Sequence, residues 1–185
     1  MNIALILAAV ALVALVVAGV VALRRRGADR RLGYLAQNDQ LTGLFNRTLF
    51  QDRVKSALAR ARREGGLVTV MFLDIDGFKE VNDRFGHAVG DDLLRQVAER
   101  LVACLRETDT VARLGGDEFT VILEGGKRVE DAGQVAMKIL QEISRPYTVG
   151  TREIVVTTSI GIAVYPFDGD SYEDLLKGAD TAMYQ

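Results

Sequence analysis

The sequence predicts an α+β domain with a mostly antiparallel central sheet flanked by helices, preceded by one N-terminal transmembrane helix. Three features of the chain predict this arrangement. Residues 3–23 form a long uncharged apolar run, residues 67–73 form a short and almost wholly apolar strand-like run, and residues 110–123 contain two strand-like runs joined by a Gly-Gly turn. Helical segments stand between these strands, so a single sheet covered by helices is the expected architecture.

Residues 3–23 are predicted to cross a membrane. They are Ala, Val, Leu, Ile and one Gly, and at about 1.5 Å per residue such a helix reaches roughly 30 Å, the thickness of a bilayer core. A buried soluble helix is seldom this long without a polar residue. A cleaved signal peptide is disfavoured because no basic residue precedes the run and three arginines, not a small-residue cleavage site, follow it.

The basic residues after this run predict its orientation. Residues 24–38 form a juxtamembrane linker, and its first eight residues carry five Arg and one Asp. The positive-inside tendency then leaves the C-terminal portion in the cytoplasm, which makes the chain a single-pass protein of the inner (cytoplasmic) membrane.

The basic linker masks an acidic remainder. Subtracting the linker's net charge of +4 from the total of −2 leaves −6 for the other residues. General binding to nucleic acid requires a basic face, so we expect no nucleic-acid partner. Cys104 is the single cysteine, and no intramolecular disulfide is possible.

Hydrophobic periodicity and turn residues predict the elements that follow. Residues 46–64 have helical periodicity, with Asn46 as N-cap and Gly65 as a stop. The run at 67–73 suits a central strand covered on both faces. The other expected elements are helices at 78–85, 91–105, 130–143 and from 172, and strands at 110–114, 118–123, 147–149 and 153–165.

Two acidic pairs stand at the ends of predicted strands. Asp74 and Asp76 follow the first buried strand, and Asp117 and Glu118 follow the Gly-Gly turn of the hairpin. If the hairpin lies beside that strand, the carboxylates converge and repel one another, which a hard divalent cation such as Mg²⁺ resolves. Solvated turn carboxylates are the alternative. Spacing alone therefore limits the function to metal-dependent phosphate handling.

The chain is similar to the GGDEF family in several motifs that occur in the family's order. Residues 115–119 reproduce the signature Gly-Gly-Asp-Glu-Phe that names the family. Further similar blocks stand at residues 39–47, 74–79, 82–83, 86–87, 90–91, 159–163 and 179–184. The resemblance covers residues 39–185 and implies a GGDEF domain of the nucleotide-cyclase, palm-like type. Family members usually continue beyond the equivalent of Gln185 with basic residues that contact the triphosphate, so we expect a truncated domain with weaker activity.

The resemblance implies a diguanylate cyclase that condenses two GTP molecules into cyclic di-GMP. Asp74 and Asp117, with the backbone carbonyl of Ile75, would hold Mg²⁺, with Mn²⁺ as an alternative. Asp117 is the family's proposed general base towards the ribose 3′-hydroxyl, and Glu118 is similar to a residue the family needs for activity.

The same resemblance implies a guanine-nucleotide site. Asn82 and Asp91 would read the guanine base, because an Asp can accept from both N1–H and the exocyclic amine, a pair that adenine lacks. The further substrate-binding residues it implies are His87, Lys79, Gly115 and Gly116. For His87 a structural turn residue is the alternative, for Lys79 a solvated lysine, and for the glycines an ordinary hairpin turn.

Catalysis requires a second GTP that faces the first, so two chains are expected to meet as an antiparallel homodimer. Arg106 and Asp109 resemble the family's RxxD inhibitory site, where cyclic di-GMP binds and damps synthesis; a helix-end ion pair is the alternative. Two rival functions stay open. One is a non-catalytic receptor for GTP or cyclic di-GMP, and the other is a membrane-bound interaction protein.

Overall fold

The computed structural model describes residues 37–126 and 128–184. The predicted membrane-spanning run at 3–23 and all but the last two residues of the linker at 24–38 lie outside this range. Within the described ranges, no helix is both long enough and apolar enough to span a bilayer.

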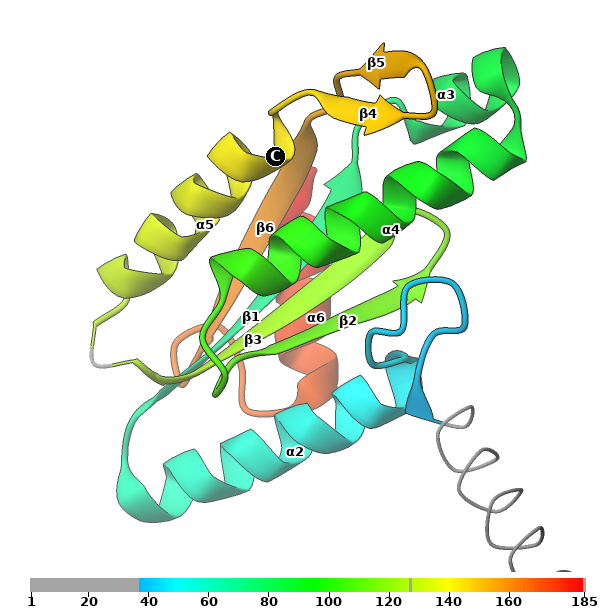
Figure 1. The fold of residues 1–185 in the computed structure, drawn as a ribbon. Helices are drawn as coiled ribbons and strands as arrows, with labels where there is room; N and C mark the ends of the chain where they lie inside the picture. Colours follow the sequence, from blue (N-terminus) through cyan, green and yellow to red (C-terminus); the bar gives the residue numbers. More distant parts are fainter. Residues whose placement is uncertain (1–36, 127, 185) are drawn as a thin grey trace, which may run out of the picture. The chain divides into compact units, whose positions relative to one another are not determined.

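A four-stranded sheet forms the centre of the domain, in the order β2-β3-β1-β6 (Figure 1). All three pairings between neighbouring strands are antiparallel. A separate two-stranded ribbon pairs β4 with β5. The strands are β1 (Leu67–Ile75), β2 (Thr110–Gly115), β3 (Glu118–Gly126), β4 (Tyr147–Val149), β5 (Arg152–Ile154) and β6 (Thr158–Tyr165). The predicted antiparallel sheet is confirmed.

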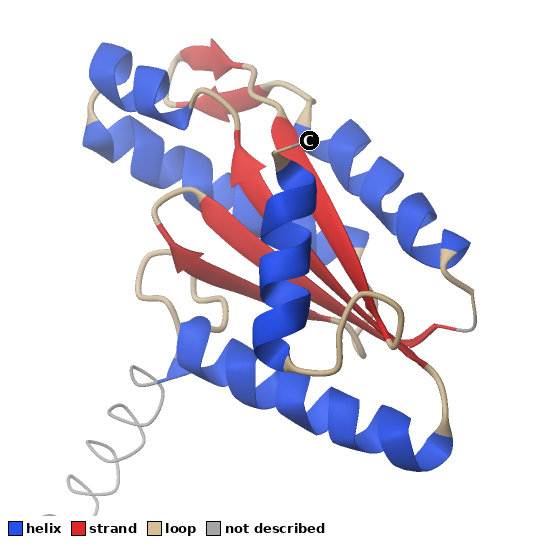
Figure 2. Cartoon of the chain, turned by 180° about the vertical axis from the view of Figure 1, so that it is seen from behind, coloured by secondary structure: helices blue, strands red, loops and turns tan. Residues whose placement is uncertain are grey.

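Helices cover both faces of this sheet. They are α2 (Arg47–Glu64), α3 (Phe78–Phe85), α4 (His87–Cys104), α5 (Glu130–Ile143) and α6 (Tyr172–Met183). Figure 1 shows α4 and α5 in front of the sheet, and the view from behind in Figure 2 shows α6 crossing the opposite face, with α2 beside it. The predicted α+β layering is therefore confirmed.

The central strand β1 supplies side chains to two hydrophobic cores. Met71 and Leu73 belong to the core under α3, α4 and α5, whereas Val70 and Phe72 belong to the core under α2 and α6. Successive side chains of a strand point to opposite faces. A strand buried on both faces must therefore be apolar at nearly every position, which explains the unbroken apolar run in the sequence.

Capping residues define the helix boundaries that the sequence predicts. The Asn46 side chain accepts a hydrogen bond of 3.1 Å from the Leu49 amide at the start of α2. Ser171 does the same for Asp174 at the start of α6, at 3.1 Å. Each side chain satisfies an amide that has no partner in the first helical turn, so the helix begins at the next residue.

Two boundaries differ from the prediction. Helix α4 begins at His87, four residues before the predicted start at Asp91, because Gly86 alone makes the turn from α3 and Gly90 is accommodated inside the helix. The predicted strand at 153–165 is two strands, with residues 155–157 between them. The break lets the chain leave the two-stranded ribbon and enter the central sheet beside β1.

Candidate active site

Asp74 and Glu118 lie directly opposite each other in the β1–β3 ladder and form its last pair. Asp117 precedes Glu118 in the turn between β2 and β3, so three carboxylates gather at one end of the sheet. The predicted convergence of the two acidic segments is confirmed. We refer to Asp74, Asp117 and Glu118 as the carboxylate cluster.

The carboxylate cluster is electrostatically strained without a cation. Partial burial, followed by repulsion from Asp117, Asp76 and Glu118, raises the pKa of Asp74 to about 6. Burial disfavours a charged carboxylate, and neighbouring negative charges add to that penalty. A positive ion in this position would relieve both effects.

The donor set fits a magnesium ion better than a metal held by protein ligands alone. In the described ranges, no three His, Cys, Asp or Glu side chains form a ready-made metal cage. Mg²⁺ commonly binds through one or two carboxylates, together with waters and the phosphates of a substrate. The carboxylates of Asp74, Asp117 and Glu118, at one end of two neighbouring strands, fit that requirement.

The turn that carries Asp117 is held by Arg113, which lies outside the family-like motifs. Gly116 has φ 54°, a left-handed conformation that favours glycine. Its carbonyl accepts hydrogen bonds from Nε and Nη2 of Arg113, at 3.0 and 2.6 Å. Nη1 of Arg113 in turn binds both carboxylate oxygens of Asp39, at 2.9 and 3.0 Å. Asp39 is the first residue of the family-like block at 39–47, and this motif was the sequence signal that Asp39 could belong to the site.

A second residue of that block also contacts the cluster. Arg47 Nη2 lies 3.7 Å from Glu118 Oε2, and both side chains are largely exposed, at 56% and 41%. An exposed pair of this kind contributes little to stability. The pair instead affects the charge of the site, because it places the positive charge of Arg47 beside Glu118.

Tyr184 lies beside the same carboxylates, at the end of α6. Its side chain is 78% exposed. Residual desolvation, with the charges of Asp74, Asp180, Glu118 and Asp117, raises the pKa of its hydroxyl. No role for Tyr184 follows from its sequence motif alone, because its position at the cluster depends on how α6 packs against the sheet.

The predicted guanine-binding residues lie on two consecutive helices, Asn82 in α3 and Asp91 in α4. Asn82 Oδ1 is buried and has no hydrogen-bond partner among the described residues. It occupies the space beside Gly90, since a Cβ built on Gly90 would lie 2.0 Å from it. Asp91 is the next residue along α4. The Asp91 side chain is exposed. Asn82 Oδ1 is thus a buried acceptor without a partner, and such an acceptor commonly binds a ligand or an ordered water.

The other predicted substrate-binding residues are accessible. Lys79 lies in α3 and His87 is the first residue of α4, and both are exposed. Helix α3 begins three residues after β1 ends, so these side chains belong to the same end of the sheet as the carboxylate cluster.

The predicted inhibitory pair lies at the opposite end of β2. Asp109 precedes this strand, and its Oδ2 accepts from the Arg106 amide at 3.0 Å, while its own amide donates to the Arg106 carbonyl at 3.0 Å. At about 3.3 Å per residue, the length of β2 separates the pair from the signature turn by roughly 20 Å. The structure therefore does not bring Arg106 and Asp109 into the carboxylate cluster.

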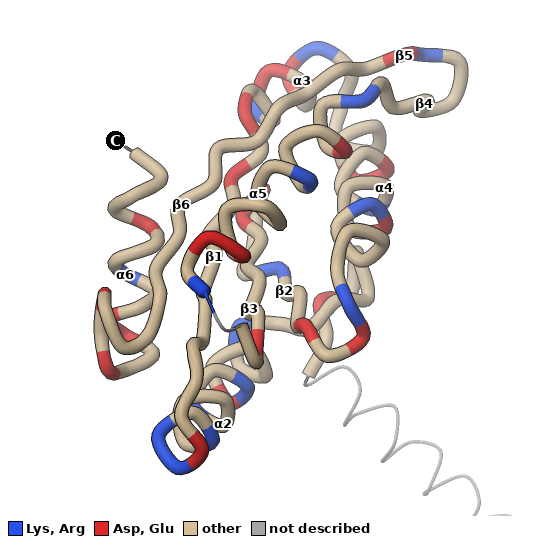
Figure 3. Tube along the Cα trace, turned by 90° about the vertical axis from the view of Figure 1, so that its left-hand side faces the viewer, with Lys and Arg blue, Asp and Glu red and all other residues tan. Residues whose placement is uncertain are grey.

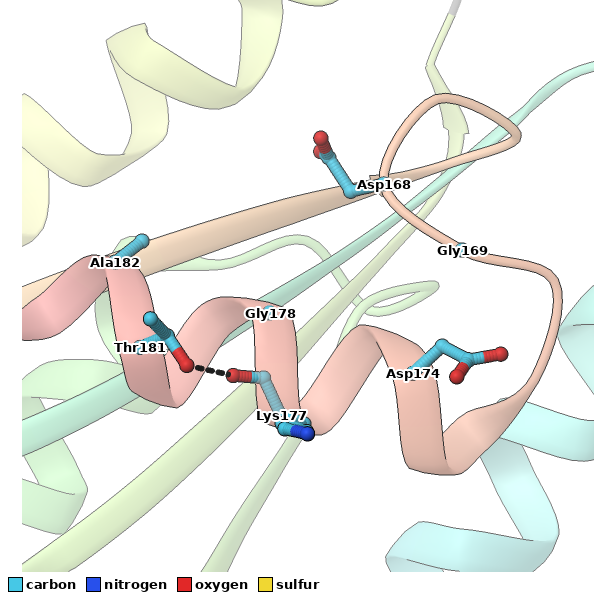
Figure 4. Close-up of a pocket in the computed structure, with 7 residues that line it drawn as sticks. All are labelled: Asp168, Gly169, Asp174, Lys177, Gly178, Thr181 and Ala182. Carbon is cyan, nitrogen blue, oxygen red and sulfur yellow. Dashed lines mark hydrogen bonds between the residues drawn. The ribbon is translucent and has the colours of Figure 1, made fainter.

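A groove of about 390 Å³ lies elsewhere, beside α6 (Figure 4). Asp168, Asp174 and Lys177 line it, and its lining includes none of the predicted site residues. Figure 4 shows Thr181 bonded to the Lys177 carbonyl, at 2.8 Å, so this hydroxyl is used within the helix. Figure 3 shows basic and acidic residues interspersed along the domain, an arrangement unlike the basic stripe of a nucleic-acid interface.

Comparison with known proteins assigns the family. Residues 36–185 match the family model described as diguanylate cyclase, GGDEF domain. MucR of Pseudomonas aeruginosa, a bifunctional diguanylate cyclase/cyclic di-GMP phosphodiesterase, is 47% identical over 157 residues, which cover 85% of this chain and 23% of MucR. The chain spans 20–37% of the lengths of eight curated relatives that it matches.

Solved structures agree with this assignment. The GGDEF domain of TpbB (YfiN) from Pseudomonas aeruginosa superposes with a TM-score of 0.78 at 42% identity, and the match covers 80% of this chain and 86% of that one. The coiled coil and GGDEF domain of DgcB from Caulobacter crescentus, solved in complex with c-di-GMP, has a TM-score of 0.81 at 28% identity, with 92% and 90% covered. From the carboxylate cluster, the signature turn and these matches together, the chain belongs to the GGDEF family of diguanylate cyclase domains.

Proposed function

We propose that this chain is a diguanylate cyclase that condenses two GTP molecules into cyclic di-GMP. The observation that carries the proposal is the meeting of Asp74 with Asp117 and Glu118 at the end of the sheet, where partial burial and then repulsion between the carboxylates raise the pKa of Asp74 to about 6. The named diguanylate cyclase TpbB, 42% identical over 162 residues, supports it.

Asp74, Asp117 and the Ile75 carbonyl would hold Mg²⁺, or Mn²⁺ in its place. The ion supplies charge neutralisation for the triphosphate and lowers the pKa of the attacking hydroxyl. Asp117 accepts the proton of the 3′-hydroxyl as general base, and Glu118 adds negative charge beside it. Arg47, 3.7 Å from Glu118, balances part of that charge.

Asn82 and Asp91 orient the substrate by its base. The buried Asn82 Oδ1 accepts one guanine N–H, and the Asp91 carboxylate accepts from the N1–H and exocyclic amine edge. Adenine offers no such donor pair, so ATP would leave a buried acceptor unpaired and is excluded. The amides of Gly115 and Gly116 approach the phosphates closely because no side chain stands in the way, while Lys79 and His87 lie on α3 and α4 near the bound nucleotide.

The reaction requires two copies of the site. Each 3′-oxygen attacks the α-phosphorus of the other GTP, one P–O bond forms as the bond to pyrophosphate breaks, and two pyrophosphates and two protons leave. One domain holds one GTP, so an antiparallel homodimer completes the active site. This dimer is part of the proposal.

A membrane anchor is the remaining part of the proposed function. We infer that residues 3–23 span the inner membrane once and that the arginines of the linker at 24–38 hold the domain at its cytoplasmic face. Alkaline-carbonate washing of membranes from expressing cells tests this: the chain stays in the pellet, and release into the supernatant contradicts the anchor.

Turnover of GTP tests the activity. The purified chain is incubated with GTP and MgCl₂, and cyclic di-GMP is measured by chromatography. Asp117→Asn abolishes product, whereas Glu99→Gln, which also removes one carboxylate but on the exposed side of α4, retains it. Tight GTP binding without product from the unaltered chain would instead identify a non-catalytic receptor. Neither binding nor product would identify an interaction protein.

A further inference from the structure

Three consecutive hydroxyl side chains, one just before β6 and two at its start, form hydrogen bonds to Asp74, near the end of β1, and to Asp76, just after it. Thr157 Oγ1 donates to Asp76 Oδ2 at 2.5 Å, and Ser159 Oγ donates to Asp76 Oδ1 at 2.8 Å. Thr158 Oγ1 donates to the Asp74 carbonyl at 2.7 Å. We refer to Thr157, Thr158 and Ser159 as the hydroxyl clamp.

The backbone of the same segment is also tied to β6. The Asp76 amide donates to the Thr157 carbonyl at 3.0 Å. In a planar trans peptide, the C=O and N–H point in opposite directions. The Ile75 carbonyl shares its peptide with the Asp76 amide, and it must therefore point away from β6.

The opposite direction leads to the signature turn. Strand β1 lies between β6 and β3 in the sheet, so a carbonyl that points away from β6 points to the β3 side. The β1–β3 ladder ends with Asp74 opposite Glu118, and its continuation would place Asp117 opposite Ile75. The Ile75 carbonyl is thus directed at the gap between the two acidic segments.

The two carboxylate oxygens of Asp76 have a different role from those of Asp74. Each accepts a hydroxyl hydrogen bond from the clamp. A carboxylate that is occupied in this way is held on the β6 side of the strand. Asp76 lies beyond the last β1–β3 pair, Asp74 and Glu118, and both of its carboxylate oxygens are bonded to side chains on the β6 side.

We propose that the hydroxyl clamp and Asp76 are positioning residues that aim the Ile75 carbonyl into the metal site, and that Asp76 is not itself a metal ligand. This inference rests on the proposed function, because it concerns the metal of that reaction. Outer partners that orient metal ligands typically change metal affinity by about 10-fold or more when they are removed. A clamp of purely structural value would change stability and leave metal affinity as it was.

Manganese titration separates these possibilities. The full chain is mixed with a non-hydrolysable GTP analogue, and bound Mn²⁺ is followed by loss of the free-ion EPR signal. The double variant Thr157→Val/Ser159→Ala removes both hydroxyls that hold Asp76, and it weakens Mn²⁺ binding about 10-fold. The hydroxyl-retaining pair Thr157→Ser/Ser159→Thr restores it. Thr148→Val, on the exposed face of β4, is the matched control and leaves Mn²⁺ affinity unchanged.

Two further variants distinguish the roles of the aspartates. Asp74→Asn abolishes Mn²⁺ binding as a lost ligand does, whereas Asp76→Asn weakens it to about the same extent as the double clamp variant. Binding of the analogue in EDTA is unchanged in the clamp variants, because the guanine residues are untouched. If circular dichroism shows the double variant to be unfolded, Thr157→Val alone is measured instead.

The outcomes fall into two groups. Equal Mn²⁺ affinity in the clamp variants and the unaltered chain overturns the clamp, and so does complete loss of Mn²⁺ in Asp76→Asn; both leave the proposed cyclase intact. Absence of Mn²⁺ binding in the unaltered chain, or binding that survives Asp74→Asn, overturns the proposed function together with this inference.

Discussion

Arg113 binds both carboxylate oxygens of Asp39 through Nη1, at 2.9 and 3.0 Å, while its other nitrogens hold the carbonyl of Gly116. The side chains of Arg113 and Asp39 are only 11% and 21% exposed. Burial by itself raises the pKa of Asp39, but hydrogen bonds from Thr42 and Arg113 outweigh it and lower that pKa below its usual value. The turn after residue 38 is therefore tied to the signature turn through one guanidinium.

Removal of Asp39 tests this connection. Asp39→Ala leaves Arg113 buried without its charged partner, and we expect a loss of about 2 kcal/mol in the free energy of unfolding. Urea denaturation measures it, with Asp52→Ala on the exposed side of α2 as the control. Equal midpoints for the two variants would show that the pair contributes nothing. We also expect the variant to lose cyclase activity under conditions in which it is still folded. Without Asp39, Arg113 is no longer held in place to bind the Gly116 carbonyl.

The raised pKa of Asp74 predicts a pH dependence of the metal-free domain. A carboxyl whose folded pKa is about 6 against an ordinary 3.8 binds its proton more tightly in the native state. Stability in EDTA therefore falls as pH rises from about 4 to about 6, and levels off above that. Asp39 does not add to this slope, because its lowered pKa places its titration at more acid pH.

Asp74→Asn removes the titrating group and flattens this slope. Urea unfolding in EDTA at several pH values between about 4 and 7 measures it, with Asp52→Asn as the charge-matched control. If stability depends on pH in the same way for Asp74→Asn and the unaltered chain, the pKa of Asp74 is not raised. Addition of MgCl₂ at pH 7 stabilises the unaltered chain more than it stabilises Asp74→Asn.

Helix α6 packs closely against the sheet at Gly161. A Cβ at Gly161 would lie 1.8 Å from the Ala179 carbonyl oxygen and 2.6 Å from the Met183 amide nitrogen. Both are backbone atoms that cannot move aside, so Gly161→Ala costs about 3 kcal/mol or more. Gly133→Ala, in α5 with nothing within 4 Å, is the control and stabilises by about 0.5–1 kcal/mol. Thermal unfolding compares the two, and a similar shift in both is the contrary result.

Gly90→Ala tests the guanine site. The added methyl displaces Asn82 Oδ1, which lies 2.0 Å from the ideal Cβ position, and crowds Phe78 at 3.2 Å. We expect at least a 10-fold loss of affinity for a GTP analogue in EDTA, because Asn82 can no longer present its acceptor to the base. Isothermal titration calorimetry measures it, and affinity for an ATP analogue is the reference for specificity. Unchanged GTP affinity would place the base elsewhere.

Arg106→Ala tests product feedback. If Arg106 and Asp109 bind cyclic di-GMP at their end of β2, the variant retains initial turnover but no longer slows as product accumulates. Progress curves with and without added cyclic di-GMP measure this effect. Lys138→Ala, whose ammonium bonds the Cys104 carbonyl at 2.9 Å, is a nearby control for loss of a positive charge. Identical slowing in Arg106→Ala and the unaltered chain contradicts the inhibitory role.

The sequence alone determined much of the local structure and the class of chemistry. An unbroken apolar run predicted the central strand at 67–73, because a strand buried on both faces is apolar at nearly every position. Helical periodicity of the apolar residues predicted the helices, because each buries one side against the sheet. Asn46 and Gly65 marked the ends of α2, because the Asn46 side chain caps the first turn and Gly65 has a positive φ that ends the helix. The signature and its companion motifs identified the family and the two acidic segments.

Only the tertiary structure decided how these segments meet. The pairing of Asp74 with Glu118, the contact of Asn82 with Gly90, and the grip of Thr157 and Ser159 on Asp76 join residues that are distant in the chain or set by helix packing. Such contacts depend on strand register and on the close approach of packed elements, which a one-residue slip would change entirely. Local patterns do not encode register, so the geometry of the site, and the positioning role inferred from it, became visible only in the folded chain.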